Sequence, residues 1–249
     1  MLRAISLALV LMFSTFPALA AGLKVGISPD YPPLAMKQEG KIVGIEADNA
    51  RALEALLGLK ITLVEMSFAE LLPALLTGQV DIIMSGFSVT DERKQQVLFT
   101  DPYMEMGQMA IVHRDKVGSF AQPWAIYREG VRVGVEPGTT GAQFAETELK
   151  DAQLKYFTDS QAAFEGLRSD TIDLYVHDAP TSWQLATAST DNDLISLYHP
   201  LTDESLAWAV RKDDENLAGM LNDALAKLKS NGTLRYILNR WIPVTVEVR

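Results

Sequence analysis

Short apolar runs alternate with helical repeats through the first third of the chain. Residues 23–27, 61–64 and 80–84 are apolar or alternate between apolar and polar positions, and each is predicted to be a strand. Between them, apolar residues recur at helical spacing after Gly44. Residues 67–70 form a capping box that opens a second helix, with Phe68 and the leucines at 71, 72, 75 and 76 on one face and a proline inside. This order of elements predicts an α/β lobe.

The same order of elements repeats further along the chain. Residues 131–135, 172–176 and 206–210 are predicted strands, and residues 160–167, 217–228 and 234–241 are predicted helices. The halves have no Gly/Ser-rich linker between them. We therefore predict an α/β fold of two lobes that are joined by strands and separated by a cleft.

The first twenty residues have the pattern of a secretory signal. A positive charge at Arg3 precedes an apolar run, and the small residues Ala18 and Ala20 stand at the two positions that a signal peptidase reads. The apolar run is shorter than the roughly 20 residues that span a bilayer. We expect cleavage after Ala20 and export to the periplasm, without a lipid anchor, because no cysteine follows the cleavage point.

Composition excludes several classes of function. The chain has 249 residues, no cysteine and a net charge of −10, which becomes −11 when Arg3 is removed. Thiol and thiolate-metal chemistry are therefore excluded. An acidic protein is also a poor candidate for binding nucleic acid or anionic lipid. An anionic group on a ligand would need local donors.

Three polar segments follow predicted strands, at the edge where open α/β sheets bind ligands. In residues 85–93, Gly86 permits close approach to the backbone, Ser88 offers a hydroxyl, and Thr90 is the expected helix cap. Arg93 adds a planar guanidinium that suits a carboxylate. The alternative is a surface arginine beside an ordinary cap.

The other two segments supply donors and an acid. Thr139 and Thr140 stand at a helix start, where hydroxyls and free amides favour an anion, although an ordinary strand-to-helix turn has the same pattern. Asp178 either accepts hydrogen bonds from an ammonium group or caps the next helix, and His177 is a pocket wall or faces solvent. A carboxylate clamp with an ammonium acceptor is what an α-amino acid requires.

Short motifs extend this picture over residues 31–241. They are Tyr31-Pro-Pro33, residues 44–48, 71–75, 78–81, 88–93, 99–103 and 138–140, the pair Asp173 and Asp178, and the pair Gly232 and Trp241. In their order and spacing, the chain resembles the extracellular solute-binding proteins for polar amino acids, above all those that bind histidine, glutamine and arginine.

The resemblance implies a fold and a function. The fold would be the type II periplasmic-binding-protein fold, with crossover strands near residues 106–112 and 201–206. We expect one lobe from residues 21–109 and 204–249 and the other from residues 110–203. The protein would act as a monomer, close its lobes around a small polar ligand, and deliver it to the permease of an ABC transporter. No metal or cofactor is expected.

The resemblance also assigns roles within the predicted site. Arg93 would grip the α-carboxylate of the ligand, and Asp178 would take the α-ammonium group. Tyr31 and Phe68 would pack against the ligand's side chain. The residues that would assist Arg93 are Gly86, Ser88, Thr90, Thr139 and Thr140.

Three positions depart from the pattern of these relatives. Ser28 stands where several carry an aspartate that contacts the ligand's side chain, which argues against a basic ligand. Leu34 replaces the usual phenylalanine after the proline pair. Glu136 stands where a glutamine binder has lysine, which argues against an acidic ligand. The preference for side-chain charge is therefore open.

Two alternatives use the same fold. Cyclohexadienyl dehydratases resemble these binders, but their chemistry needs a positioned general acid, and only Asp178 and Glu136 are candidates in this cleft. A sensor domain or a part of a lytic enzyme would continue into a membrane helix or another domain, and the sequence ends at Arg249. A stand-alone receptor that docks onto a separate sensor stays open.

Overall fold

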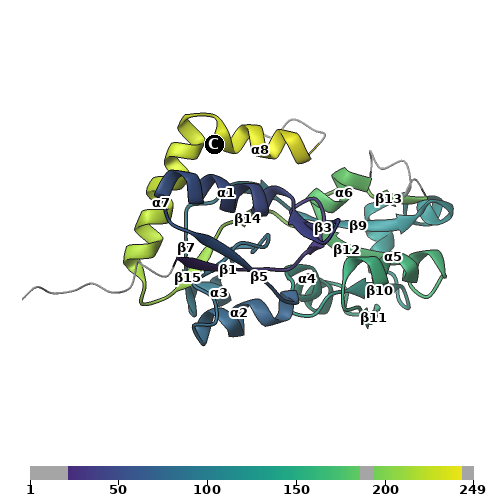
Figure 1. Cartoon of the computed structure of the whole chain (residues 1–249). Helices are drawn as coiled ribbons and strands as arrows, with labels where there is room; N and C mark the ends of the chain where they lie inside the picture. Colours follow the sequence, from purple (N-terminus) through teal and green to yellow (C-terminus); the bar gives the residue numbers. More distant parts are fainter. Residues whose placement is uncertain (1–21, 186–192, 243–249) are drawn as a thin grey trace, which may run out of the picture.

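The computed structural model describes residues 22–185 and 193–242. The predicted signal peptide lies outside these residues. Two α/β lobes lie side by side, each built on its own five-stranded sheet (Figure 1).

The first lobe has a sheet of strand order β5-β1-β6-β15-β7. The strands are β1 (Leu23–Ile27), β5 (Ile61–Glu65), β6 (Ile82–Ile83), β7 (Val97–Phe99) and β15 (Ala209–Arg211). β1 pairs in parallel with β5 and β6, whereas β15 runs antiparallel to its neighbours. One face packs on α1 (Ile45–Leu57), α7 (Glu215–Ser230) and α8 (Thr233–Trp241), and the other on α2 (Phe68–Leu76).

The second lobe has the strand order β11-β10-β12-β9-β13. The strands are β9 (Gln108–His113), β10 (Arg132–Val135), β11 (Gln153–Tyr156), β12 (Leu174–Asp178) and β13 (Leu194–Ser196). One face packs on α4 (Thr140–Glu148) and the short helices η2 (Arg114–Phe120) and η3 (Pro123–Tyr127). The other packs on α5 (Ser160–Arg168) and α6 (Ala179–Leu185).

Two antiparallel strands, β8 (Met104–Met106) and β14 (Glu204–Leu206), carry the chain between the lobes. Gly107 follows β8, and a Cβ atom there would lie 2.0 Å from the carbonyl oxygen of Thr202. Glycine thus allows the two crossing segments to touch. Residues 108 and 109, on the first-lobe side of the boundary expected from the sequence, are hydrogen-bonded in the second sheet through β9.

A small sheet stands at the cleft edge of the first lobe. It consists of β2 (Asp30–Tyr31), β3 (Ala35–Gln38) and β4 (Lys41–Val43). The backbone amides of Ile45 and Glu46, at the start of α1, donate to the carbonyls of Pro33 and Leu34. The turn that carries Tyr31 is therefore fixed to the first helix.

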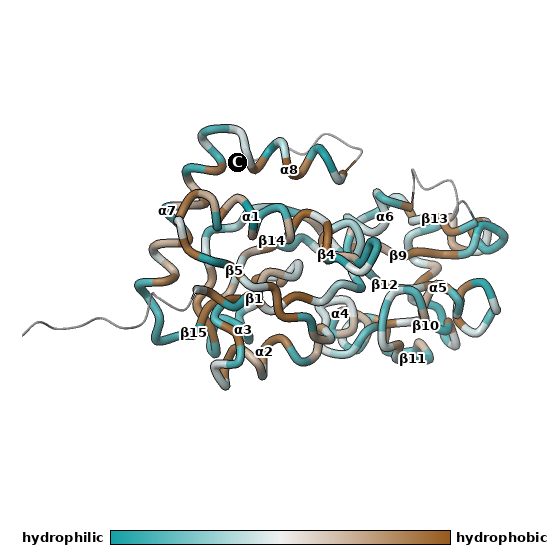
Figure 2. The backbone as a smooth tube through the Cα atoms, in the orientation of Figure 1, coloured by the Kyte–Doolittle hydropathy of each residue, from teal (hydrophilic) through white to brown (hydrophobic). Residues whose placement is uncertain are grey.

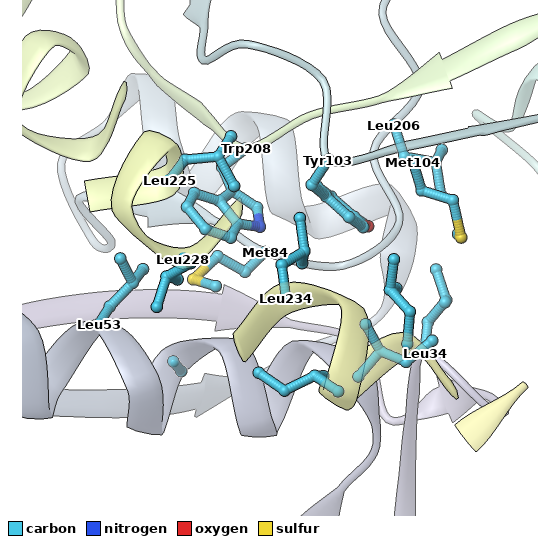
Figure 3. Close-up of a cluster of buried hydrophobic side chains, with 14 of the residues drawn as sticks. Leu34, Leu53, Met84, Tyr103, Met104, Leu206, Trp208, Leu225, Leu228 and Leu234 are labelled. Carbon is cyan, nitrogen blue, oxygen red and sulfur yellow. The ribbon is translucent and has the colours of Figure 1, made fainter. Parts of the chain in front are cut away.

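The core of the first lobe surrounds a buried carboxylate. The aromatic rings of Tyr103 and Trp208 stack with centroids 5.8 Å apart, among the leucines of α1, α7 and α8 (Figure 3). Glu46, fully buried, accepts hydrogen bonds from Tyr103 Oη at 2.7 Å, Trp208 Nε1 at 3.2 Å and the Gly86 amide at 3.0 Å. These bonds tie the segment after β6 to the crossing segments.

The apolar repeats identified in the sequence are mostly buried. Figure 2 shows hydrophobic residues recurring along the backbone of both lobes. The predicted capping box is present: the Ser67 side chain accepts from the backbone amide of Glu70, and the Glu70 side chain accepts from the backbone amide of Ser67. The apolar face of α2 is not covered along its whole length, because Leu76, in the last turn, is 47% exposed. The run of residues 80–84 is buried as predicted, but only Ile82 and Ile83 are in the sheet ladder.

Candidate functional site

Arg93 projects into the cleft from α3 (Asp91–Lys94), which follows β6. Thr90 caps this short helix, since its hydroxyl accepts the Arg93 amide at 3.1 Å. The guanidinium donates from Nη1 to the Ser88 carbonyl at 2.8 Å and from Nη2 to the Gly138 carbonyl of the other lobe at 2.9 Å. Its Cζ also lies 4.0 Å from the centroid of Phe87. Arg93 is thus a buried residue, 9% exposed, and not a surface arginine.

Asp178 ends β12 on the opposite side of the cleft and is also 9% exposed. Oδ2 accepts the hydroxyl of Tyr31 from the first lobe, and Oδ1 accepts Nε2 of Gln108. Burial raises the pKa of Asp178 to about 7, and the nearby Glu204 also raises it, against the hydrogen bonds from Tyr31 and Gln108 and the charge of Arg93.

Arg93 and Asp178 form no ion pair with each other in the described structure. Burial lowers the pKa of Arg93 to about 10, although the charges of Asp178 and Glu204 raise it. Arg93 therefore stays protonated at neutral pH, and the cleft holds one buried cation and one buried acid on opposite lobes.

Hydroxyl groups at the start of α4 close one side of the cavity. Thr139 caps α4, accepting the Ala142 amide at 3.1 Å. The Thr140 hydroxyl donates to Glu204 Oε2 at 2.7 Å and accepts from Gln108 Nε2 at 3.0 Å. Gln108 thus connects this helix start to Asp178.

Aromatic rings form the opposite wall. Tyr31 packs edge-on against His177, with ring centroids 4.8 Å apart. Phe68, at the first turn of α2, lies near Phe87, with centroids 6.0 Å apart. Gly86 has a φ of 61°, and a Cβ there would lie 2.5 Å from both the Tyr31 ring and Leu34. The absence of a side chain at Gly86 thus makes room for Tyr31 and Leu34, which fill the space beside its Cα.

The lobes are in contact across this cavity. In addition to the Arg93 and Tyr31 bonds, Ser160 Oγ donates to the Asp30 carbonyl at 2.9 Å, and Thr181 Oγ1 donates to the Pro32 carbonyl at 3.0 Å. Both pairs join the segment around β2 to helices of the second lobe. The lobes are therefore closed onto each other.

Comparison with known proteins identifies the family of this chain. Residues 23–244 match the family model described as bacterial extracellular solute-binding proteins, family 3. The chain belongs to this family. ABC transporter arginine-binding protein 1 of Escherichia coli strain K12 is 31% identical, over 97% of this chain and 100% of that protein. The histidine-binding periplasmic protein of Salmonella typhimurium is 28% identical, over 98% and 97%.

Solved structures agree with this family assignment. The ancestral amino acid-binding protein AncCDT-1, described as a precursor of cyclohexadienyl dehydratase, is 33% identical with a TM-score of 0.83. The match covers 88% of this chain and 95% of that one. These relatives are binding proteins, so the dehydratase alternative is not favoured for this solute-binding protein.

Eight of the nine site residues expected from the sequence line the cavity. They are Tyr31, Phe68, Gly86, Ser88, Arg93, Thr139, Thr140 and Asp178. Thr90 lies outside, in a neighbouring hollow with Glu92 and Gln143, and acts here through the helix that carries Arg93. Among the residues that departed from the family pattern, Ser28 and Glu136 line the cavity, whereas Leu34 is buried beneath Gly86.

Gln108, Asp30 and Val176 also line the cavity and were not predicted to do so. Gln108 had one signal in the sequence: it is a polar residue in the otherwise apolar run of residues 106–112. His177, which the sequence left undecided, is a buried wall residue of this solute-binding protein.

The described residues contain neither a metal-binding cluster nor a helix that could span a membrane. No group of three or more His, Asp or Glu side chains within residues 22–185 and 193–242 is arranged to hold a metal ion. In the same residues, every helix is too short or too polar to cross a membrane.

Proposed function

We propose that this protein binds an α-amino acid between its lobes, in the periplasm, and delivers it to the permease of an ABC transporter. One observation carries the proposal: a buried guanidinium, Arg93, and a buried carboxyl group, Asp178, line one cavity from opposite lobes without pairing. An α-amino acid has a carboxylate and an ammonium group on one carbon, so a single ligand satisfies both.

Both clamp residues have hydrogen-bonding capacity to spare. A guanidinium has five N–H donors, and Arg93 uses two of them on carbonyl oxygens. An ionised carboxylate has about four acceptor positions, and Asp178 uses two of them, on Tyr31 and Gln108. A ligand can therefore join these contacts. The Ser88 hydroxyl lines the same cavity as a further donor for the ligand's carboxylate, whereas the Thr139 hydroxyl already donates to the Glu136 carbonyl at 2.8 Å.

Binding by hinged closure follows from the division of the clamp between lobes. Each lobe alone presents half of the partners, so the full set of ligand contacts exists only when the cleft is closed. The paired strands β8 and β14 are the covalent links about which the lobes would open. Gly107, between β8 and β9, lets the two crossing segments lie in contact at this point.

The relatives support the transport role and the compartment. By their names, the relatives above bind arginine and histidine, and one is an ABC transporter component and another is periplasmic. We extend this role to the present protein, exported by cleavage after Ala20 and active as a monomer.

A ligand screen tests the proposal. Thermal denaturation with the twenty amino acids and with small organic acids should reveal stabilisation by at least one amino acid. A ligand at 100 times its Kd stabilises by about 2.7 kcal/mol. Small-angle scattering should then report a protein at least as compact with the ligand as without it. Stabilisation by organic acids that lack an ammonium group, and by no amino acid, would contradict the proposal.

A further inference from the structure

The sheet of the second lobe divides the polar residues of the cavity into two groups. Side chains alternate between the faces of β12, so that Val176 packs with α4 whereas Tyr175 packs against Phe164 of α5, with centroids 5.9 Å apart. The clamp carboxyl group of Asp178 has the parity of Val176 and shares Gln108 with the start of α4. His177 has the parity of Tyr175 and lies on the α5 side. The clamp leaves this second group unused.

The α5 side of the cavity is acidic. The side chain of Glu136 is 12% exposed and accepts the hydroxyl of Tyr175. Asp30 also lines the cavity, and its carbonyl is bonded by Ser160, beside the Asp159 cap of α5. Burial raises the pKa of Glu136 against the charge of His177 and the hydrogen bond from Tyr175, and the charges of Asp159 and Asp178 raise it further. Asp30 is more exposed: partial burial and the charge of Asp159 raise its pKa, while the charge of Lys37 lowers it.

Arg93 is the only arginine or lysine among the described residues that line the cavity, and it is engaged at the other side. Outside the lining, the charge of Lys37 acts on Asp30 but not on Glu136. His177 is the nearest candidate to neutralise Glu136, with Nε2 at 3.6 Å from Glu136 Oε1. Burial, however, lowers the pKa of His177 despite the opposing charge of Glu136, which favours the neutral imidazole. In addition, Nδ1 of His177 is buried without a hydrogen-bond partner in the described structure. This is a second, independent sign of an incomplete site.

We infer that the ligand's side chain carries a positive charge, and that Glu136 is the residue that selects it. The inference rests on the proposed function, because it takes Arg93 and Asp178 as the partners of the ligand's main-chain groups. A zwitterion bound there leaves the buried carboxyl group of Glu136 without an arginine or lysine partner. A guanidinium or ammonium group at the end of the side chain would supply the missing charge and donors. The cationic side chain would contact Glu136 directly, held in place by the Tyr175 hydroxyl.

This conclusion revises the expectation from position 28. Ser28 removes an acid that relatives have there, and its amide is bonded to Ser85 Oγ at 2.9 Å. The carboxyl groups of Glu136 and Asp30 supply negative charge in the same cavity from other positions. The basic ligand that Ser28 argued against is therefore the class that the charges favour.

The test compares two ligands that differ in charge and little in shape, L-arginine and its neutral ureido analogue L-citrulline. Calorimetry is done on the wild type, on Glu136→Gln, and on Glu146→Gln as a matched control. Glutamine keeps an oxygen for the Tyr175 hydroxyl. Glu146 also accepts a tyrosine hydroxyl, from Tyr156 at 2.7 Å, but does not line this cavity.

The wild type and Glu146→Gln should prefer arginine by about tenfold or more, equivalent to about 1.4 kcal/mol. Glu136→Gln should reduce this preference to within about threefold, chiefly by weakening arginine. The assignment would be overturned by equal affinities of the wild type for the two ligands, or by an unchanged preference in Glu136→Gln. It would also be overturned if the wild type bound an uncharged or acidic amino acid, such as L-glutamate, more tightly than arginine. In each case the clamp would be left intact. Failure of every amino acid to bind would overturn the proposed function and this inference together.

Discussion

Replacing Arg93 with alanine removes the carboxylate partner of the proposed clamp. The guanidinium is 9% exposed, contacts Phe87, and bonds to carbonyl oxygens of both lobes. Its burial in a closed cleft strengthens any contact with a ligand carboxylate, because little water competes for it. The substitution would leave a ligand's carboxylate buried opposite neutral groups.

The expected magnitude follows from that geometry. Removing one partner of a buried, hydrogen-bonded charge pair costs about 2 to 5 kcal/mol. At about 1.4 kcal/mol for each tenfold change, the Kd should rise roughly 30-fold to several-thousand-fold. Arg93→Lys should also bind poorly, because an ammonium group cannot make two parallel bonds to a carboxylate.

Arg93 also joins the lobes through the Gly138 carbonyl, so part of the loss would come from weakened closure. A double-mutant cycle separates the two effects. Amidation of the ligand's carboxylate should weaken binding to the wild type strongly and to Arg93→Ala little. Calorimetry on the four combinations supplies the coupling energy. If Arg93→Ala binds the unmodified ligand within about threefold of the wild type, the carboxylate-clamp reasoning is wrong.

Three further predictions concern Asp178, a pair of glycines and the buried carboxylate of Glu46. Burial raises the pKa of Asp178 from 3.8 to about 7, so the stability from its protonated form is lost as the pH rises through this window. In thermal denaturation, the stability of Asp178→Asn should therefore depend less on pH between pH 4 and 8 than that of the wild type. An equal pH dependence in the two proteins would refute the assignment. Gly86→Ala should destabilise by about 2 kcal/mol or more because of its positive φ and the clash with Tyr31. Gly219→Ala, in the interior of α7 with open space around it, should instead stabilise by about 0.5 to 1 kcal/mol; urea unfolding measures both, and equal signs would contradict the argument. Glu46→Ala should cost about 3 kcal/mol or more in the same assay, because it leaves several buried donors unpaired, and a loss below about 1 kcal/mol would show that they find other partners.

Local signals made most of the elements predictable from the sequence. The capping box at Ser67 and the cap at Thr90 are contacts over three residues, and both are present as expected. The exposed Leu76 shows the limit of periodicity, because spacing identifies a face but not where the covering layer ends. The length of β6 was missed for a related reason. A residue belongs to a strand only where it pairs with a neighbouring strand, and within residues 80–84 only Ile82 and Ile83 pair with β1 and β15.

The candidate site was predictable where chemistry coincides with a strand end, as at Arg93 and Asp178. Gln108 escaped because its role depends on register. It stands opposite Asp178 where β9 and β12 pair antiparallel, a contact between residues 70 positions apart. His177 was undecided for the same reason, since one residue's difference in parity decides whether a side chain joins the α4 side or the α5 side of the sheet.

In the proposed clamp, the separation of Arg93 and Asp178 is itself a source of selectivity. Burying a charge is unfavourable unless it is paired, and closure buries both groups without joining them. A ligand with a carboxylate and an ammonium group offsets both penalties at once. A ligand with only one of these groups leaves the other clamp residue buried without a partner, so closure around that ligand is unfavourable. Discrimination then comes as much from the penalty on the wrong ligand as from contacts with the right one. In the proposed mechanism this penalty arises on closure, so ligand recognition and lobe closure are expected to be a single equilibrium.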